Sequence, residues 1–306
     1  MLPSLIIIAG PTGIGKTETV LKLAEPLGAE VISADSMQVY KRMDIGTAKP
    51  TPEEQARVRH HMIDVVEPDE TFNAAQFREM AEPIIHGLHS SGKPVFVAGG
   101  TGLYIKVLTQ GIFPCPEGNE EIRQRLTDQA DTLGSEVLFE RLRAVDPAGA
   151  ESIHPNDTYR IIRALEVFEL TGRPFSEHHD IHRFKEIPYR TLKIALAMDR
   201  AILYERIERR VDRMIKQGLL DEVQGLLDDG FSPGLKSMQS IGYSHAVKFL
   251  RGKFSFDEMV HTLKRDTRRY AKRQFTWFKA DPEMTWLEPG DIDGMRKMVN
   301  VFLQHS

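Results

Sequence analysis

Short apolar runs alternate with helical patterns through the first third of the chain. The apolar run at 5–9 precedes a segment, 16–27, whose apolar residues recur at helical spacing, and another apolar run follows at 29–34. Further strands are expected at 62–66 and 94–98, on either side of a helix at 73–90. Strands and helices that alternate in this way predict a parallel α/β sheet with right-handed crossovers.

The pattern changes near residue 112. Residues 113–118 have the prolines and glycine of a linker, and helical stretches rich in arginine and glutamate follow at 119–133, 135–145 and 157–171. A strand pattern returns at 191–197, and the chain is mostly helical from 201 onwards, with one of these helices expected at 239–249. We therefore expect a core formed by 1–112 and 191–306, interrupted by an all-helical insertion domain at 113–190.

The turn after the first apolar run has the sequence GPTGIGKT. It fits the P-loop pattern G-x-x-x-x-G-K-[ST] and lies between a strand and a helix, as that motif requires. Its glycines let backbone N–H groups turn towards a phosphate, Lys16 adds a full charge, and the Thr17 hydroxyl is a ligand for Mg²⁺. The sequence thus predicts a P-loop NTPase-like core whose phosphate-binding residues are Gly10, Pro11, Thr12, Gly13, Ile14, Gly15, Lys16 and Thr17.

Two more polar turns follow expected strands, at Asp35 and at Thr101. Because the carboxyl ends of parallel strands share one edge of a sheet, we expect both residues to lie near the P-loop. Asp35 would hold Mg²⁺ through water or accept a proton, unless it only shapes its turn. Thr101 would approach a ligand, cap a helix or do both. The neighbours Ser36 and Gln38 are able to recognise hydrogen-bonding groups of a ligand.

Composition narrows the classes of partner. The chain has 306 residues, a net charge of −4 and one cysteine, Cys115. The molecule as a whole is therefore no basic nucleic-acid binder, and it has no internal disulfide. No apolar run is long enough to span a bilayer. We expect a cytoplasmic enzyme that has no membrane partner and acts as a monomer.

Basic residues nevertheless gather in two places. One face of an expected helix carries Arg265, Arg268, Arg269 and Lys272. The insertion carries Arg123, Arg125, Arg160 and Arg163. Such clusters contact nucleic-acid phosphates, but a solvated helix face has the same pattern, and the arginines of the insertion have Glu121 and Glu166 as potential partners.

Six segments, in order, resemble the bacterial tRNA dimethylallyltransferases, also called tRNA isopentenyltransferases. They are GPTGIGKT (10–17), SADSMQVYKRMDIGTAKP (33–50), AGGTGLY (98–104), HPNDTYRIIRALEV (154–167), SMQSIGY (237–243) and TRRYAKRQFTWF (267–278). The second segment is far more specific than the P-loop alone. The chain departs from the family at Gly13-Ile14, where Ala-Ser is more frequent, and at Ser244, where a lysine is common. The first departure leaves the phosphate cradle intact, and the second affects a peripheral contact.

The resemblance implies a reaction and a role for each site. Dimethylallyl diphosphate would donate its five-carbon group to the exocyclic amine of the adenosine 3′ of a tRNA anticodon, and pyrophosphate would leave. The P-loop and Mg²⁺ would hold the diphosphate, Asp35 would accept the amine proton, and Thr101 would lie at the base or the bridging oxygen. The residues expected to contact the anticodon stem-loop are Asp35, Ser36, Met37, Gln38, Thr101, Arg123, Tyr159, Arg160, Ile161, Ile162 and Arg163.

Two alternatives use the same P-loop. A small-metabolite kinase would transfer phosphate from ATP, and the sequence shows no arginine-rich lid to place over the phosphates. An RNA-binding protein switched by a nucleotide would need an acidic strand end, for which Asp199 is a weak candidate. Nucleotide turnover separates both alternatives from prenyl transfer.

Overall fold

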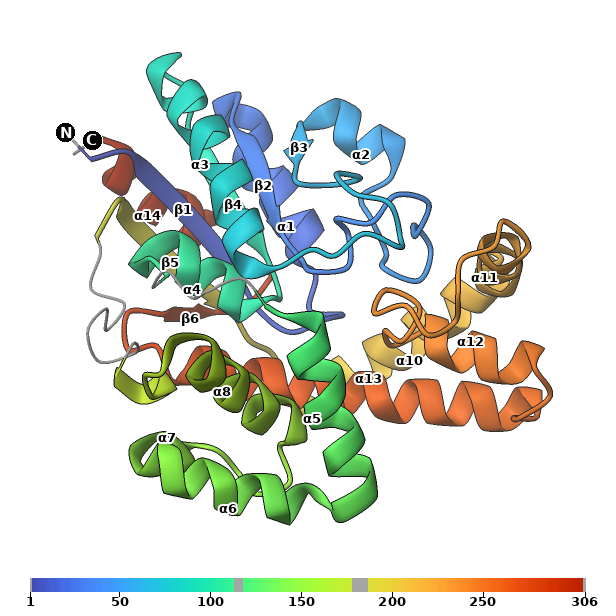
Figure 1. Ribbon diagram of the computed structural model, residues 1–306. Coiled ribbons are helices and arrows are strands. Elements are labelled where there is room, and N and C mark those ends of the chain that lie inside the picture. Colours follow the sequence, from blue (N-terminus) through green and yellow to red (C-terminus); the bar gives the residue numbers. More distant parts are fainter. Residues whose placement is uncertain (1, 113–117, 178–186, 305–306) are drawn as a thin grey trace. The chain divides into compact units, whose positions relative to one another are not determined.

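The computed structural model describes residues 2–112, 118–177 and 187–304 (Figure 1). Cys115 and most of the expected linker lie outside the described residues. The chain divides into two compact units, one formed by 1–109 with 187–306 and the other by 110–186. No helix in the described part of the chain is long and apolar enough to cross a membrane.

The first unit is built on a six-stranded parallel sheet in the order β3-β2-β4-β1-β5-β6. The strands are β1 (Ser4–Ala9), β2 (Glu30–Ala34), β3 (His60–His61), β4 (Val95–Gly99), β5 (Arg190–Leu196) and β6 (Thr285–Leu287). All six residues of the central strand β1 are buried, as expected for a parallel strand covered on both faces.

The strand register aligns the carboxyl ends of the inner strands. Ala9 pairs with both Gly99 and Ala195, and Gly99 also pairs with Ala34. The next residues of β1, β2 and β4 are the first residue of the P-loop, Asp35 and Gly100. The expected convergence at one edge of the sheet is therefore a direct result of this register.

Helices cover both faces of the sheet (Figure 1). On one face α1 (Lys16–Ala24), which a short 3₁₀ turn extends, and α14 (Ile292–Gln304) pack against the side chains of Ile6 and Ile8. On the other face α3 (Ala74–Ser90) and α4 (Gly102–Gln110) pack against Leu5 and Ile7.

Five further helices belong to this unit. They are α2 (Pro52–Arg57), α10 (Arg200–Lys216), α11 (Leu219–Asp228), α12 (Tyr243–Leu250) and α13 (Phe256–Lys279). Asp199 caps α10: its carboxylate accepts hydrogen bonds from the N–H groups of Ala201 and Ile202. This aspartate is therefore used in helix capping.

In its described residues, the second unit contains helices and no strand. Its helices are α5 (Glu120–Leu133), α6 (Ser135–Val145), α7 (Pro147–Ser152) and α8 (Thr158–Thr171). They enclose a separate apolar core around Leu126, Leu142, Ile161 and Leu165.

Two expected elements are wrong in their bounds. The strand expected at 62–66 is absent, and β3 comes two residues earlier. Met62 and Asp64 have φ of 64° and 55°, which extended backbone does not allow. The helix expected from 239 begins only at Tyr243, because Gly242 has a φ of 100° and ends the preceding turn. The short elements β6 and α2 were not expected.

Candidate active site

The P-loop adopts the backbone that its glycines allow. Gly13 and Gly15 have φ of 80° and 105°, values that residues with a side chain rarely adopt. A Cβ at Gly13 would lie 2.9 Å from the Ile207 side chain, so the loop is also pressed against α10. The first N–H groups of α1 follow directly, as in an anion-binding helix start.

Lys16 folds back over its own loop. Its ammonium donates hydrogen bonds to the carbonyl oxygens of Gly10, at 3.0 Å, and Pro11, at 2.9 Å. The pKa of Lys16 is lowered to about 8, mainly by burial; the Asp35 carboxylate opposes this shift and the Arg210 charge adds to it. The amine is thus close enough to Asp35 and Arg210 for the three charges to influence one another.

Helix α10 supplies two arginines that we did not predict. A Cβ at Gly15 would lie 3.1 Å from an Arg206 guanidinium nitrogen, so this side chain lies against the P-loop. Arg210 lies one turn further along the helix. Burial lowers the pKa of its guanidinium, and the Asp35 carboxylate opposes this shift. Our argument against a kinase was that the sequence shows no arginine-rich lid; because α10 brings arginines to the P-loop without a lid motif, that argument does not separate the two functions. A helix after a strand of the sheet, with arginines four residues apart, was the available signal.

Asp35 and Thr101 lie side by side at the sheet edge. The Thr101 hydroxyl accepts a hydrogen bond from the N–H of Ser36, at 2.9 Å, and the Thr101 N–H donates to the carbonyl oxygen of Ala34, at 3.0 Å. The Asp35 carboxylate accepts from the N–H of Met37, at 2.9 Å. One Asp35 oxygen therefore shapes the turn, and no hydrogen bond within the described residues is recorded for the other.

Gln274 of α13 joins the P-loop to the turn after β4. Its side-chain oxygen accepts from the N–H of Thr12, at 2.8 Å, and its nitrogen donates to the carbonyl oxygen of Gly100, at 2.9 Å. Gly100 needs to be a glycine, because a Cβ there would lie 2.2 Å from the Gln274 nitrogen. The neighbouring Tyr270 hydroxyl has its pKa raised by burial and by Asp35. Helix α13 thus forms one wall of the site.

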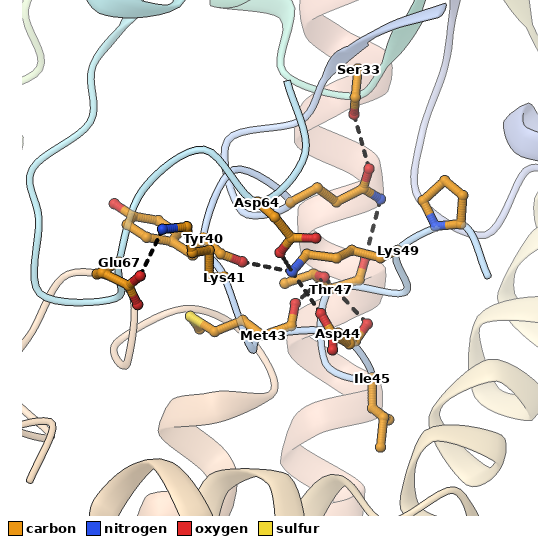
Figure 2. Close-up of polar contacts among 12 residues, drawn as sticks. Ser33, Tyr40, Lys41, Met43, Asp44, Ile45, Thr47, Lys49, Asp64 and Glu67 are labelled. Atoms are coloured by element: carbon orange, nitrogen blue, oxygen red, sulfur yellow. Dashed lines mark hydrogen bonds and ion pairs between the residues drawn. The ribbon is translucent and has the colours of Figure 1, made fainter. Parts of the chain in front are cut away.

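Both ends of the Gln38 side-chain amide form hydrogen bonds with other residues of the protein. Its oxygen accepts from the Ser33 hydroxyl at 2.9 Å, and its nitrogen donates to the carbonyl oxygens of Thr47 and Ala48, at 3.4 and 3.3 Å. Figure 2 shows Ser33 and Thr47. Both ends of this amide are therefore engaged. In this structure its contacts support the turn that carries Asp35 and Ser36, and a contact of Gln38 with a ligand stays a prediction.

Comparison with known proteins identifies the family. The sequence model described as IPP transferase matches residues 38–281, most of the chain beyond the P-loop. The chain belongs to the IPP transferase family. It is 54% identical to a tRNA dimethylallyltransferase of Syntrophobacter fumaroxidans, over 95% of this chain and 85% of that one. It is 52% identical to a tRNA dimethylallyltransferase of Geobacter metallireducens, over 97% of each chain.

Solved structures agree with this assignment. The full-length tRNA isopentenylpyrophosphate transferase of Bacillus halodurans has a TM-score of 0.74 and 40% identity, over 99% of this chain and 97% of that one. A eukaryotic dimethylallyltransferase acting on tRNA has a TM-score of 0.83 and 28% identity, over 99% and 80%. The mixed α/β fold, with its parallel sheet, is therefore that of the IPP transferases.

In this IPP transferase the arginines of the helical unit surround a buried acid. Glu166 is fully buried and accepts hydrogen bonds from Arg123, at 3.0 Å, from Arg163, at 2.7 Å, and from the N–H of Asn119, at 2.7 Å. The expected intrahelical pairing with Glu166 is confirmed for Arg163, whereas Arg123 pairs with Glu120 in its own helix and reaches Glu166 from α5. Their side chains remain partly exposed, at 41% and 27%, so this pairing leaves each guanidinium accessible to solvent.

The other residues expected to contact RNA in this unit differ in exposure. Tyr159 is 75% exposed, and Arg160 is exposed beside Asp157. Ile161 and Ile162 are buried in the apolar core of the unit, because α8 turns that face inwards. Their side chains therefore support the helix that presents Tyr159 and Arg160.

The basic face of α13 is partly neutralised. Arg268 pairs with Glu208, and Arg265 and Arg269 pair with Asp266. Lys272 is exposed. Within the described residues no group of three or more His, Cys, Asp or Glu side chains is arranged to hold a metal ion. Thr17, the first threonine of α1, is partly exposed at the P-loop.

Proposed function

We propose that this IPP transferase is a tRNA dimethylallyltransferase. It moves the dimethylallyl group from dimethylallyl diphosphate to the exocyclic amine of the adenosine 3′-adjacent to the anticodon and releases pyrophosphate. The observation that carries the proposal is the placement of Asp35 beside a P-loop that Lys16, Arg206 and Arg210 surround with positive charge. The names of its relatives support the same reaction.

The P-loop side chains bind the diphosphate and take up the charge that forms on it. As the bond between the allylic carbon and the bridging oxygen breaks, the electron pair stays on the diphosphate oxygen. The ammonium of Lys16 and the guanidinium groups of Arg206 and Arg210 then stabilise this charge in a site with little water. The arginines belong to a helix that is already in place: α10 holds Arg206 against the loop and Arg210 within electrostatic reach of Lys16 and Asp35.

Mg²⁺ fits the chemistry of this loop. Mg²⁺ keeps most of its water ligands and binds through one or two protein oxygens together with phosphate oxygens. The Thr17 hydroxyl would hold the ion. Bound there, Mg²⁺ supplies positive charge to the leaving diphosphate.

Asp35 acts on the acceptor amine. The amine nitrogen forms the new bond to carbon and must lose one proton, which the free Asp35 oxygen accepts. Thr101 and the N–H of Met37 hold this turn, so the carboxylate is fixed before the base arrives. The adenosine must leave its stack to reach Asp35, at a cost of about a few kcal/mol that contacts with the RNA backbone offset. Arg123, Arg163 and the exposed Tyr159 and Arg160 supply such contacts.

One transfer assay tests this function. Purified protein is incubated with Mg²⁺, radiolabelled dimethylallyl diphosphate and an anticodon stem-loop with consecutive adenosines next to the anticodon. We expect label in the RNA, no label when guanosine replaces the acceptor adenosine, and loss of transfer in Lys16→Ala and Asp35→Asn. Phosphate transfer from ATP to a small metabolite, without label in the RNA, would instead support a kinase.

A further inference from the structure

A single carboxylate of α11 holds the backbone turn at 44–46. Glu222 accepts hydrogen bonds from the N–H groups of Asp44, Ile45 and Gly46, at 2.9, 2.7 and 3.1 Å. The acceptor lies 176 to 178 residues from these donors in the chain, so the contact is made only by the tertiary fold. Three successive N–H groups on one carboxylate form a rigid and strong contact.

Tyr243 completes this clamp, which we define as Glu222, Tyr243 and the turn 44–46. The buried Tyr243 hydroxyl donates to Glu222 at 2.5 Å, and burial and the Glu222 carboxylate both raise the pKa of this hydroxyl. The ring occupies the space beside Gly46, where a Cβ would lie 2.3 Å from a ring carbon. Any side chain at Gly46 would therefore displace the ring from the clamp.

The turn that the clamp holds continues into the contacts of Gln38. Its next residues are Thr47 and Ala48, whose carbonyl oxygens accept from the Gln38 amide. Gln38 in turn lies only three residues after Asp35. A shift of the turn would therefore release the Gln38 amide, and with it one support of the Asp35 segment.

Lys49 stabilises the same turn through contacts with Tyr40, Asp44 and Asp64. Its nearly buried ammonium, with a side chain 5% exposed, donates to the Tyr40 carbonyl oxygen at 2.6 Å and contacts Asp44 and Asp64 at 2.6 and 2.5 Å (Figure 2). Four residues of the described chain other than glycine have positive φ, and all lie between 42 and 64: Arg42, Ala48, Met62 and Asp64. Such strained backbone persists only where its surroundings hold it in place.

We propose that Glu222 is a positioning residue for the transfer to RNA. Through the clamp it fixes the turn 44–48, which holds Gln38 and so the segment from Asp35 to Gln38 that receives the acceptor base. The proposal rests on the proposed function for the identity of the acceptor. It predicts that damage to the clamp slows transfer to RNA and leaves diphosphate binding unchanged, because within the described residues no hydrogen bond joins the clamp to the P-loop or to α10.

The experiment compares Glu222→Gln and Tyr243→Phe with Asp221→Asn. Asp221 is the exposed neighbour on α11, so its substitution removes the same charge without touching the turn. Single-turnover transfer to RNA is measured with both substrates saturating, alongside calorimetric binding of pyrophosphate and circular dichroism. We expect Glu222→Gln to slow transfer about tenfold or more, as misplaced reacting groups do, Tyr243→Phe to slow it less, and Asp221→Asn to match the wild type.

The outcomes are distinct. Transfer by Glu222→Gln at the rate of Asp221→Asn would overturn the proposal, and so would an equal loss of pyrophosphate binding in folded Glu222→Gln, since that would be general damage. If Glu222→Gln does not fold, the same comparison of Tyr243→Phe with Asp221→Asn decides. Failure of the proposed function has its own signature, which is that the wild type transfers no label to RNA.

Discussion

The Thr101 hydroxyl accepts a hydrogen bond from the N–H of Ser36 at 2.9 Å, joining the turns after two neighbouring strands. Thr101→Val keeps the shape of the side chain and removes this acceptor. We expect transfer to RNA to slow about tenfold, because the Asp35 turn loses a fixed support. Thr101→Ser should restore most of the rate. Pyrophosphate affinity, measured by calorimetry, should be equal in all three proteins, and its loss in Thr101→Val would show wider damage.

The pKa of Lys16, about 8, gives diphosphate binding a pH dependence. Lys16 is charged below this pKa and neutral above it. A bound anion raises the pKa, because it favours the charged form. Above pH 8, binding is therefore coupled to the uptake of a proton by Lys16. Affinity for pyrophosphate should be steady near pH 7 and fall above pH 8, by at most about tenfold per pH unit from this group. Calorimetry in buffers of different ionisation enthalpy measures the uptake. Lys16→Arg, which stays charged, should remove this part of the slope; an unchanged slope would mean that another group is responsible.

Arg210 should contribute strongly to diphosphate binding. Arg210→Met removes a cation that lies within electrostatic reach of Lys16 and Asp35. We expect a loss of about 1.5–3 kcal/mol in pyrophosphate binding, as for other hydrogen bonds to charged groups. Arg209→Met is the matched control, because exposed Arg209 pairs with Glu205 on the same helix. Equal affinities in the two variants would exclude Arg210 from the phosphate site.

Gln274 should couple the P-loop to the turn after β4. Gln274→Leu leaves the N–H of Thr12 and the carbonyl oxygen of Gly100 without this partner, at a cost of about 1–3 kcal/mol in stability. We expect weaker pyrophosphate binding as the loop loosens. Gln274→Glu retains an acceptor for Thr12 but loses the donor to Gly100, so it separates the two contacts. Denaturant titration measures stability, and Gln224→Leu, on the exposed face of α11, provides the control.

Glu166 should stabilise the helical unit. Glu166→Ala leaves Arg123, Arg163 and the N–H of Asn119 without their shared acceptor. We expect a loss of about 1–3 kcal/mol, below the full cost of breaking a buried ion pair, because both arginines reach solvent. Denaturant titration should show it, with exposed Glu121→Ala as control. A loss no larger than that of Glu121→Ala would contradict this role.

The centre of the fold was predictable because its signals are local. The P-loop, Asp35 and Thr101 each follow an apolar strand, and parallel strands end at one edge. Strand register then brings these residues together without any further information. The helical unit was predictable for a similar reason, since its helices carry strong periodicity and a change in composition marks the start.

Contacts between distant elements were not predictable. The partners of Gln274 lie 262 and 174 residues away, and nothing in a stretch of α13 indicates which glutamine faces the P-loop. Arg206 and Arg210 depend in the same way on the rotation of α10 against the loop. The segment 62–66 looked like a strand because four of its five residues are apolar, whereas the fifth, Asp64, pairs with Lys49, and Met62 and Asp64 have positive φ.

The Lys16 ammonium has consequences for which anions the loop retains. The ammonium already donates to two carbonyl oxygens of its own loop, so its positive charge has hydrogen-bond partners before any ligand binds. An entering ligand must draw the ammonium away from these carbonyls. A diphosphate presents several charged oxygens at once, and these can replace both carbonyls as partners of the ammonium. Anion binding at this loop is therefore an exchange of contacts for Lys16, and the affinity is the difference between the new contacts and the two that are given up.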